Sequence, residues 1–127
     1  MDESFLLNPS ALSFMGDAVY SLMVRKKLCA ISRPSSELHS LSVKLVKASA
    51  QTNAFNLIKD MLTEKELSAF KRGRNMHTAS TPKNSSKSEY HTATGVEALF
   101  GYLYLSNQLD RIEELFEVIW SDFCGNN

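Results

Sequence analysis

The stretch HTATGVEALFGYLYL, residues 91–105, is apolar on nearly every side of a helix and contains one carboxylate. Val96, Leu99 and Leu103 recur within it at helical spacing. A helix that is apolar all round is stable only when other elements cover it on every side. The sequence therefore predicts a central helix that begins at residue 91 or 92 and ends near residue 105.

Helical patterns also fill most of the remaining chain, and the sequence has neither strand-like alternation nor a hairpin dipeptide such as Asn-Gly. Asn8 and Pro9 are a good N-cap and first residue for one helix, and Thr63 with Glu66 forms a capping box for another. Residues 35–62 are expected to form one long helix or two collinear ones. The expected helices span about residues 8–29, 35–62, 63–71, 91–105 and 109–123, so we predict an all-α helical bundle.

The length and composition restrict the class of protein. A chain of 127 residues fits one domain, which we expect to span residues 1–127. The longest apolar run, residues 98–105, is far shorter than the roughly 18 residues that indicate a membrane helix, and the acidic N-terminus is unlike a signal peptide. Cys29 and Cys124 share no metal-ligand spacing and are expected to be buried, reduced thiols. These features predict a cytoplasmic protein with no membrane contact.

The net charge of zero conceals a segregation of charge along the chain. Residues 25–47 carry six bases and one acid, residues 71–91 carry five bases and one acid, and residues 107–127 carry five acids and one base. Two basic segments in a small protein allow a face that binds phosphate groups, although such bases also solvate the outer faces of helices. Few aromatic residues interrupt the basic segments, which favours a duplex over a single-stranded nucleic acid.

A polar loop precedes the central helix. Residues 78–88 contain four Ser, two Thr and two Lys, but only one aliphatic residue, Ala79. A long loop in a compact domain is usually functional or disordered, so we expect a flexible basic loop over about residues 72–90. We predict that four bases of this loop contact phosphates: Arg72, Arg74, Lys83 and Lys87. Two further predicted contacts are Lys44 and Lys47, which share the outer face of segment 35–62 with Gln51.

Two carboxylates stand out because the helices that carry them are otherwise apolar. Asp17 and Glu97 are both expected to be buried, and buried acids are rare unless they are paired, hydrogen-bonded or bound to metal. Two such acids on the two most apolar helices suggest that they converge on one cation. Oxygen ligands without a Cys/His cluster favour Mg²⁺ or Mn²⁺ over Zn²⁺. Pairing with Lys or capping a helix is the alternative role for each acid.

The two acids lie in motifs that resemble a known family. Phe14-Met15-Gly16-Asp17-Ala18-Val19 resembles the signature of the ribonuclease III catalytic domain, and ATGVEALFG, residues 93–101, resembles the second acidic motif of that domain. Arg72-Gly73-Arg74-Asn75 and the loop that follows resemble the short bacterial branch called Mini-ribonuclease III. The resemblance covers about residues 8–123. We therefore expect a catalytic domain alone, with no double-stranded-RNA-binding domain behind it.

Three positions depart from the full-size family, and each departure replaces an acid. Ser10 and Ser13 stand seven and four positions before Asp17, and Thr94 stands three positions before Glu97. The short branch is known for this reduced acidic set, so the departures support that branch. The three hydroxyls could at most hold waters bound to the metal.

The resemblance implies a homodimeric, metal-dependent endoribonuclease of the all-α ribonuclease III type. It implies cleavage of double-stranded RNA to give 5′-phosphate ends, with Asp17 and Glu97 as catalytic metal ligands and Mg²⁺, or Mn²⁺ as a substitute, as the cofactor. The implied substrate is the precursor of large-subunit (23S) ribosomal RNA. Phe14 would insert into the partner subunit at the dimer interface, whereas periodicity alone allows it equally well as a core residue.

Two other classes of function compete with the nuclease. One is a non-catalytic RNA-binding or ribosome-associated module on the same fold, against which the two acids argue because a pure binder has no need of them. The other is a helical protein-interaction domain that uses the acidic C-terminal face, which leaves the basic loop without a role.

Overall fold

A computed structural model of the chain describes residues 8–31, 33–76 and 86–125. These residues contain six helices and a short 3-10 turn but no strand, which confirms the predicted all-α class. The elements are α1 (Pro9–Cys29), α2 (Ser35–Val46), α3 (Ala48–Ile58), η2 (Lys59–Met61), α4 (Glu64–Arg74), α5 (Lys87–Leu105) and α6 (Leu109–Gly125).

Side-chain caps fix the starts of two helices where the sequence predicts them. The Oδ1 atom of Asn8 accepts hydrogen bonds from the backbone N–H groups of Ser10, at 3.0 Å, and Ala11, at 3.3 Å. Thr63 and Glu66 form the predicted capping box, since each side chain accepts a hydrogen bond from the backbone N–H of the other. These caps satisfy donors that the first turn of a helix leaves free.

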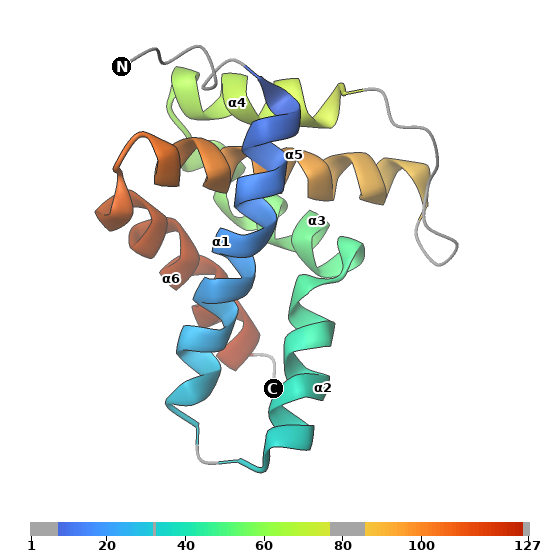
Figure 1. Cartoon of the computed structure of the whole chain (residues 1–127), viewed down its shortest axis with the longest axis vertical. Coiled ribbons are helices and arrows are strands. Elements are labelled where there is room, and N and C mark those ends of the chain that lie inside the picture. Colours follow the sequence, from blue (N-terminus) through green and yellow to red (C-terminus); the bar gives the residue numbers. More distant parts are fainter. Residues whose placement is uncertain (1–7, 32, 77–85, 126–127) are drawn as a thin grey trace.

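The predicted long helix over residues 35–62 is divided at Lys47, where the backbone is extended with φ −66° and ψ 158°. The two parts are therefore not collinear, and the chain changes direction between α2 and α3 (Figure 1). The break also changes which side chains share a face. Gln51 is 3% exposed and lies in phase with the buried Ala54 and Ile58, so its predicted place on an outer face is wrong.

The predicted loop over residues 72–90 is shorter than the sequence suggests. Helix α4 continues to Arg74, and α5 begins at Lys87. The early start of α5 depends on Ser86, whose side chain accepts a hydrogen bond of 3.1 Å from the backbone N–H of Glu89. Ser86 belongs to the polar run of residues 78–88, which composition alone assigns to a loop. Lys83 lies outside the described residues.

Helix α5 occupies the centre of the fold, where α1 crosses it and α4 packs along it (Figure 1). Glycines make the crossing with α1 unusually close. A Cβ atom added at Gly16 would lie 1.5 Å from the carbonyl oxygen of Glu97, and one at Gly101 would lie 1.9 Å from the carbonyl oxygen of Leu12. The two helices therefore meet backbone to backbone.

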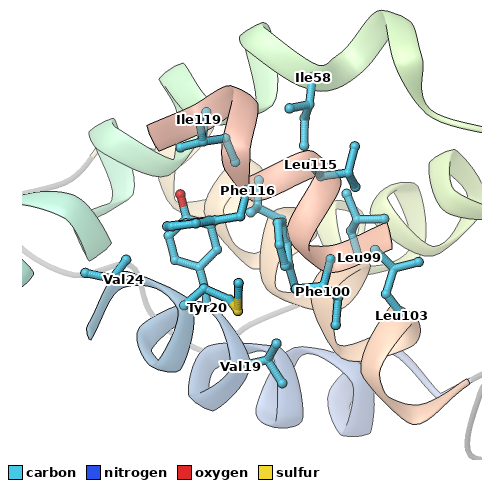
Figure 2. Packing of buried hydrophobic residues seen from close by; sticks show 14 of the residues in the cluster. Val19, Tyr20, Val24, Ile58, Leu99, Phe100, Leu103, Leu115, Phe116 and Ile119 are labelled. Atoms are coloured by element: carbon cyan, nitrogen blue, oxygen red, sulfur yellow. The ribbon is translucent and has the colours of Figure 1, made fainter. Parts of the chain in front are cut away.

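The main core lies where α1, α3, α5 and α6 meet (Figure 2). Three aromatic rings hold α1, α5 and α6 together at this point. Tyr20 packs edge-on against Phe100, with ring centroids 5.2 Å apart, and against Phe116, at 5.5 Å. Edge-to-face pairs at such distances add stabilisation to the burial of the rings themselves.

A buried ion pair joins α4 to α6. The guanidinium of Arg111 donates two hydrogen bonds to the carboxylate of Glu66, at 2.8 and 2.9 Å, and a third to the carbonyl oxygen of Met61, at 2.6 Å. Burial alone would raise the pKa of Glu66, but the hydrogen bonds from Arg111 and Thr63 outweigh it and lower the pKa below its ordinary value. The pair therefore stabilises the fold at neutral pH and loses this effect as acid protonates Glu66.

The two cysteines are placed differently from what the sequence predicts. Cys29 and Cys124 are free thiols, but both are exposed, so their predicted burial is wrong. Cys29 is the last residue of α1, and Cys124 is the next-to-last residue of α6. Among the described residues, no helix is long and apolar enough to cross a membrane.

We predict that Gly16→Ala destabilises the protein by about 2–3 kcal/mol, because the added methyl group overpacks the crossing of α1 and α5. Urea unfolding measures the change. Gly125→Ala is the matched control, since a Cβ there meets no atom within 4 Å. Equal stability of the two variants would show that the helices separate at little cost.

Candidate active site

The fold brings the two predicted carboxylates together. Asp17 follows Gly16 on α1, and Gly16 is the residue that contacts the backbone of Glu97 on α5. The two carboxyl groups lie close enough for the charge of Asp17 to raise the pKa of Glu97. Both line an open cleft of about 350 Å³. Residues far apart in the sequence thus form one acidic site because two glycine-containing helices cross there.

The two carboxylates differ in their surroundings. Burial of Glu97 and the nearby charge of Asp17 together raise the pKa of Glu97 to about 8, while a hydrogen-bonding contact with Gln51 opposes this rise. The sequence predicts that both acids are buried. For Asp17 this prediction is wrong, because its side chain is exposed. Asp17 is exposed although it lines the cleft together with residues of α5, whereas Glu97 is only partly exposed.

The three hydroxyls that replace acids all line the same cleft. The Oγ of Ser10 donates to Sδ of Met76 at 3.2 Å, the Oγ of Ser13 donates to the carbonyl of Ser10 at 3.3 Å, and the Oγ1 of Thr94 donates to the carbonyl of Tyr90 at 3.0 Å. Each hydroxyl proton is therefore engaged within the protein. The oxygen lone pairs are left to accept hydrogen bonds, for example from water.

Sequence reasoning missed two residues of the cleft, Met76 and Tyr90. Tyr90 is seven positions before Glu97 and four before Thr94, so all three share one face of α5. Recognising that α5 starts at residue 87 would have placed Tyr90 on this face. Met76 follows the end of α4, and no pattern in the sequence indicates its contact with Ser10.

Gln51 is buried, although the sequence predicts it on an outer face. Its Nε2 donates a hydrogen bond of 2.9 Å to the carbonyl oxygen of Val46, the last residue of α2. Its Oε1 is buried among the described residues without a hydrogen-bond partner. An unsatisfied buried acceptor costs about 1–3 kcal/mol, so this arrangement requires an explanation. Its phase with Ala54 and Ile58 is the signal that could have revealed its burial.

Two of the predicted basic residues lie close to the acidic cleft. Lys87 is exposed and shares a face of α5 with Tyr90 and Thr94, three and seven positions further on. Arg72 lines a neighbouring cleft of about 700 Å³, and Met76 lines both this cleft and the acidic one. The Nε of Arg72 is buried without a partner in the described structure. Positive charge thus flanks the carboxylates along α4 and α5.

The other bases are placed differently. Arg74 lies over the Phe70 ring, 5.6 Å from its centroid, and donates to the side chain of Asn75. Lys44 lines a separate cleft together with Tyr20 and Trp120, and this cleft shares no residue with the acidic one. Lys47 is exposed at the break between α2 and α3. The structure therefore does not bring Lys44 into the acidic site.

Phe14 is 82% exposed and lies at the acidic cleft beside Asp17, so it is not a core residue. Two helical turns further along α1, Leu22 is 59% exposed on the same face, with the exposed Ala18 between them. An apolar stripe of this kind on a surface helix indicates a face that another surface covers.

The donors in the cleft suit a hard divalent cation. The described residues contain no group of three or more His, Cys, Asp or Glu side chains placed to bind a metal, which leaves the two carboxylates and the hydroxyl oxygens. Mg²⁺ prefers oxygen ligands, keeps several waters, and is often bound by one or two carboxylates together with substrate phosphates. A cation would also relieve the repulsion that raises the pKa of Glu97. The residues present therefore fit such an ion.

Two carboxylates that adjoin in an open cleft on a helical bundle suit a metal-dependent enzyme that acts on the phosphate backbone of nucleic acids. A family model described as the Ribonuclease III domain matches residues 10–108, and the chain belongs to this family. It is an endoribonuclease that acts on double-stranded RNA. Enzymes of this family generally depend on divalent metal ions.

Comparisons with individual proteins point to one branch of the family. The chain is 45% identical to the Mini-ribonuclease 3 of Thermoanaerobacter sp. over 88% of this chain and 80% of the relative. It is 37% identical to the Mini-ribonuclease 3 of Clostridium tetani, over 89% and 76%. A crystal structure of a protein from Fusobacterium nucleatum superposes with a TM-score of 0.79 at 28% identity, over 85% of this chain and 84% of that one. The predicted resemblance is confirmed.

We predict that Glu97→Gln stabilises the metal-free protein at pH 8 by about 2–4 kcal/mol, because each unit of pKa shift corresponds to about 1.4 kcal/mol. The pKa of Glu97 is raised from 4.5 to about 8. The folded state therefore binds more protons than the unfolded state between these values, and stability falls as pH rises through them. The gain from the substitution should vanish at pH 4.

Urea unfolding in EDTA at both pH values measures this difference. Glu113→Gln is a suitable control, because Glu113 is an exposed carboxylate of α6 that pairs with Lys26. If Glu97→Gln has the same effect at pH 4 and pH 8, then Glu97 does not carry the raised pKa.

Proposed function

We propose that Asp17 and Glu97 bind Mg²⁺, for which Mn²⁺ can substitute, and form the active site of this endoribonuclease with it. The proposal rests on one observation: two acidic side chains adjoin in an open cleft. Their proximity is unfavourable when both are ionised, because the charge of Asp17 raises the pKa of Glu97. Bound Mg²⁺ supplies Lewis-acid polarisation of a phosphate and a more acidic water. Hydrolysis at this site would leave 5′-phosphate ends.

The neighbouring side chains have supporting roles in this proposal. Ser10, Ser13 and Thr94 present hydroxyl oxygens to the cleft while their protons are bound elsewhere. They can therefore accept hydrogen bonds from waters that the ion holds, and so fix the direction of these waters. Asp17 is exposed and Glu97 is partly buried, so in this proposal an arriving RNA phosphate would meet Asp17 first.

We infer that duplex RNA lies over α4 and the start of α5. Lys87 shares a face of α5 with the residues of the cleft, and Arg72 lies in the adjoining cleft with an unpartnered Nε. Phosphate contacts of this kind position a duplex without reading its sequence. Arg74 and Lys83 are proposed as further contacts. The proposal for Lys44 and Lys47 rests on their charge and exposure alone.

We further propose a homodimer in which the apolar stripe of Phe14, Ala18 and Leu22 meets the partner subunit. Its support is the exposure of these residues, together with the position of Phe14 at the acidic cleft. A two-fold axis would provide two sites, one for each strand of a duplex. The partner would cover Phe14 and lie close to Asp17.

We propose that the natural substrate is the precursor of large-subunit (23S) ribosomal RNA in the cytoplasm, as the resemblance to the short branch implies. The direct assay incubates the purified protein with a structured precursor transcript and Mg²⁺, and maps the ends produced. EDTA should abolish cleavage. Cuts scattered over unrelated duplexes at the same rate would contradict this substrate.

We predict that Asp17→Asn and Glu97→Gln each slow cleavage of a defined RNA duplex by more than about 100-fold, the upper limit of what changes around metal ligands usually cost. Both substitutions keep the shape of the side chain and remove the charge that the ion requires. Gel assays at saturating Mg²⁺ measure the rate, and filter binding with Ca²⁺ measures RNA affinity. Affinity should change little.

Glu113→Gln again serves as the control, because Glu113 is an exposed carboxylate of α6 that does not line the cleft. A variant of Asp17 or Glu97 that cleaves at the wild-type rate would remove the basis for the proposed metal site.

We predict that the wild-type chain is a dimer by light scattering and that Phe14→Ala raises its dissociation constant at least tenfold, because buried aromatic anchors often contribute about 2 kcal/mol or more at interfaces. Val43→Ala removes another exposed apolar side chain, on α2, and should leave the dimer intact. A wild-type monomer, or equal dissociation constants for the two variants, would contradict this interface.

A further inference from the structure

Gln51 contacts the acidic site from its buried side. It lies on α3, is 3% exposed, and does not line the cleft. Its side chain nevertheless lies close enough to Glu97 to lower the pKa of that carboxyl group, against the rise that burial and Asp17 impose. Glu97 therefore has Asp17 on the side of the cleft and a neutral amide behind it.

The orientation of the Gln51 amide is fixed by its two neighbours. The carbonyl oxygen of Val46 accepts a hydrogen bond of 2.9 Å from Nε2, and the Glu97 carboxylate also accepts hydrogen bonds when ionised. An NH₂ group has two protons and can serve both acceptors. Rotating the amide by 180° would place Oε1 against two other oxygens. Oε1 is therefore held where no described group donates to it.

An unsatisfied Oε1 is unexpected if Gln51 only fills space, because native structures seldom leave a buried polar atom unpaired. The arrangement is explained if the donor side of the amide is what the protein needs. One N–H of the amide bonds the carbonyl oxygen of Val46 at the end of α2, and the second N–H of the same NH₂ group can then serve Glu97.

We propose that Gln51 is a positioning residue for Glu97: its amide, anchored on the Val46 carbonyl, holds the carboxylate in the orientation required to bind the metal ion. The inference rests on the proposed role of Glu97 as a metal ligand and adds to it a residue from a third helix. Groups that hydrogen-bond a metal ligand orient it, and their loss typically costs 10- to 100-fold in metal affinity or activity.

Two substitutions test this role. Gln51→Met keeps the length of the side chain but removes the donor. Gln51→Glu keeps the shape and replaces the donor with an acceptor that repels Glu97. Thr52→Val is the matched control, because the neighbouring Thr52 also donates from its side chain to a backbone carbonyl, that of Ala48 at 2.9 Å. The full chain is used throughout, with thermal unfolding measured for every variant.

Three quantities are compared with the wild type: kcat and KM for a defined RNA duplex, and the affinity for Mn²⁺ without RNA, followed by electron paramagnetic resonance. We expect Gln51→Met to lower kcat and weaken Mn²⁺ binding about tenfold or more, with less than a twofold change in KM. Gln51→Glu should lose at least as much, and it decides the matter if Gln51→Met folds poorly. Thr52→Val should match the wild type in all three.

A purely structural role predicts another result. If both Gln51 variants keep wild-type kcat and Mn²⁺ affinity and only unfold at a lower temperature, Gln51 merely caps α2 and the proposal is wrong. Glu97→Gln, measured in parallel, separates this failure from that of the metal site. Wild-type cleavage by Glu97→Gln would overturn the site itself, whereas an inactive Glu97→Gln beside fully active Gln51 variants would overturn only the role of Gln51.

Discussion

The close crossing of α1 over α5 is the constraint on which the rest of the structure depends. Gly16 and Gly101 have no Cβ, so the two backbones touch where any other residue would force them apart. The residue after Gly16 is Asp17, and the residue whose carbonyl Gly16 meets is Glu97. Helix packing and the meeting of the two carboxylates are therefore consequences of one contact.

The acidic cleft combines groups that do not satisfy one another. Burial and Asp17 raise the pKa of Glu97, and the hydroxyls of Ser13 and Thr94 give their protons to backbone carbonyls instead of to the carboxylates. The amide of Gln51 acts against this rise in the pKa of Glu97. A site built in this way favours a cation, and the exposed Asp17 leaves it open to an RNA phosphate.

The sequence predicts the helices well and singles out the two carboxylates that the fold brings into one cleft, because both features depend on local pattern. Asn8 and the pair Thr63 and Glu66 are caps that act within one turn, and the apolar centre of α5 needs no knowledge of its partners. Phase across a break is harder to predict. Lys47 interrupts the segment 35–62, and the shift in phase moves Gln51 from the expected outer face to the core. The exposure of Asp17 likewise depends on how α1 sits on α5, which periodicity along one helix does not specify.

The glycines of the crossing stabilise the fold, whereas the ionised carboxylate of Glu97 destabilises it. A side chain at Gly16 or Gly101 would disrupt the crossing, whereas replacing Glu97 by a neutral residue removes a strained charge. Over evolutionary time, a lineage released from selection for catalysis would drift toward loss of the acids while purifying selection kept the glycines. This architecture is thus predisposed to yield pseudoenzymes, which would retain the helical scaffold and its basic surface after the chemistry is gone.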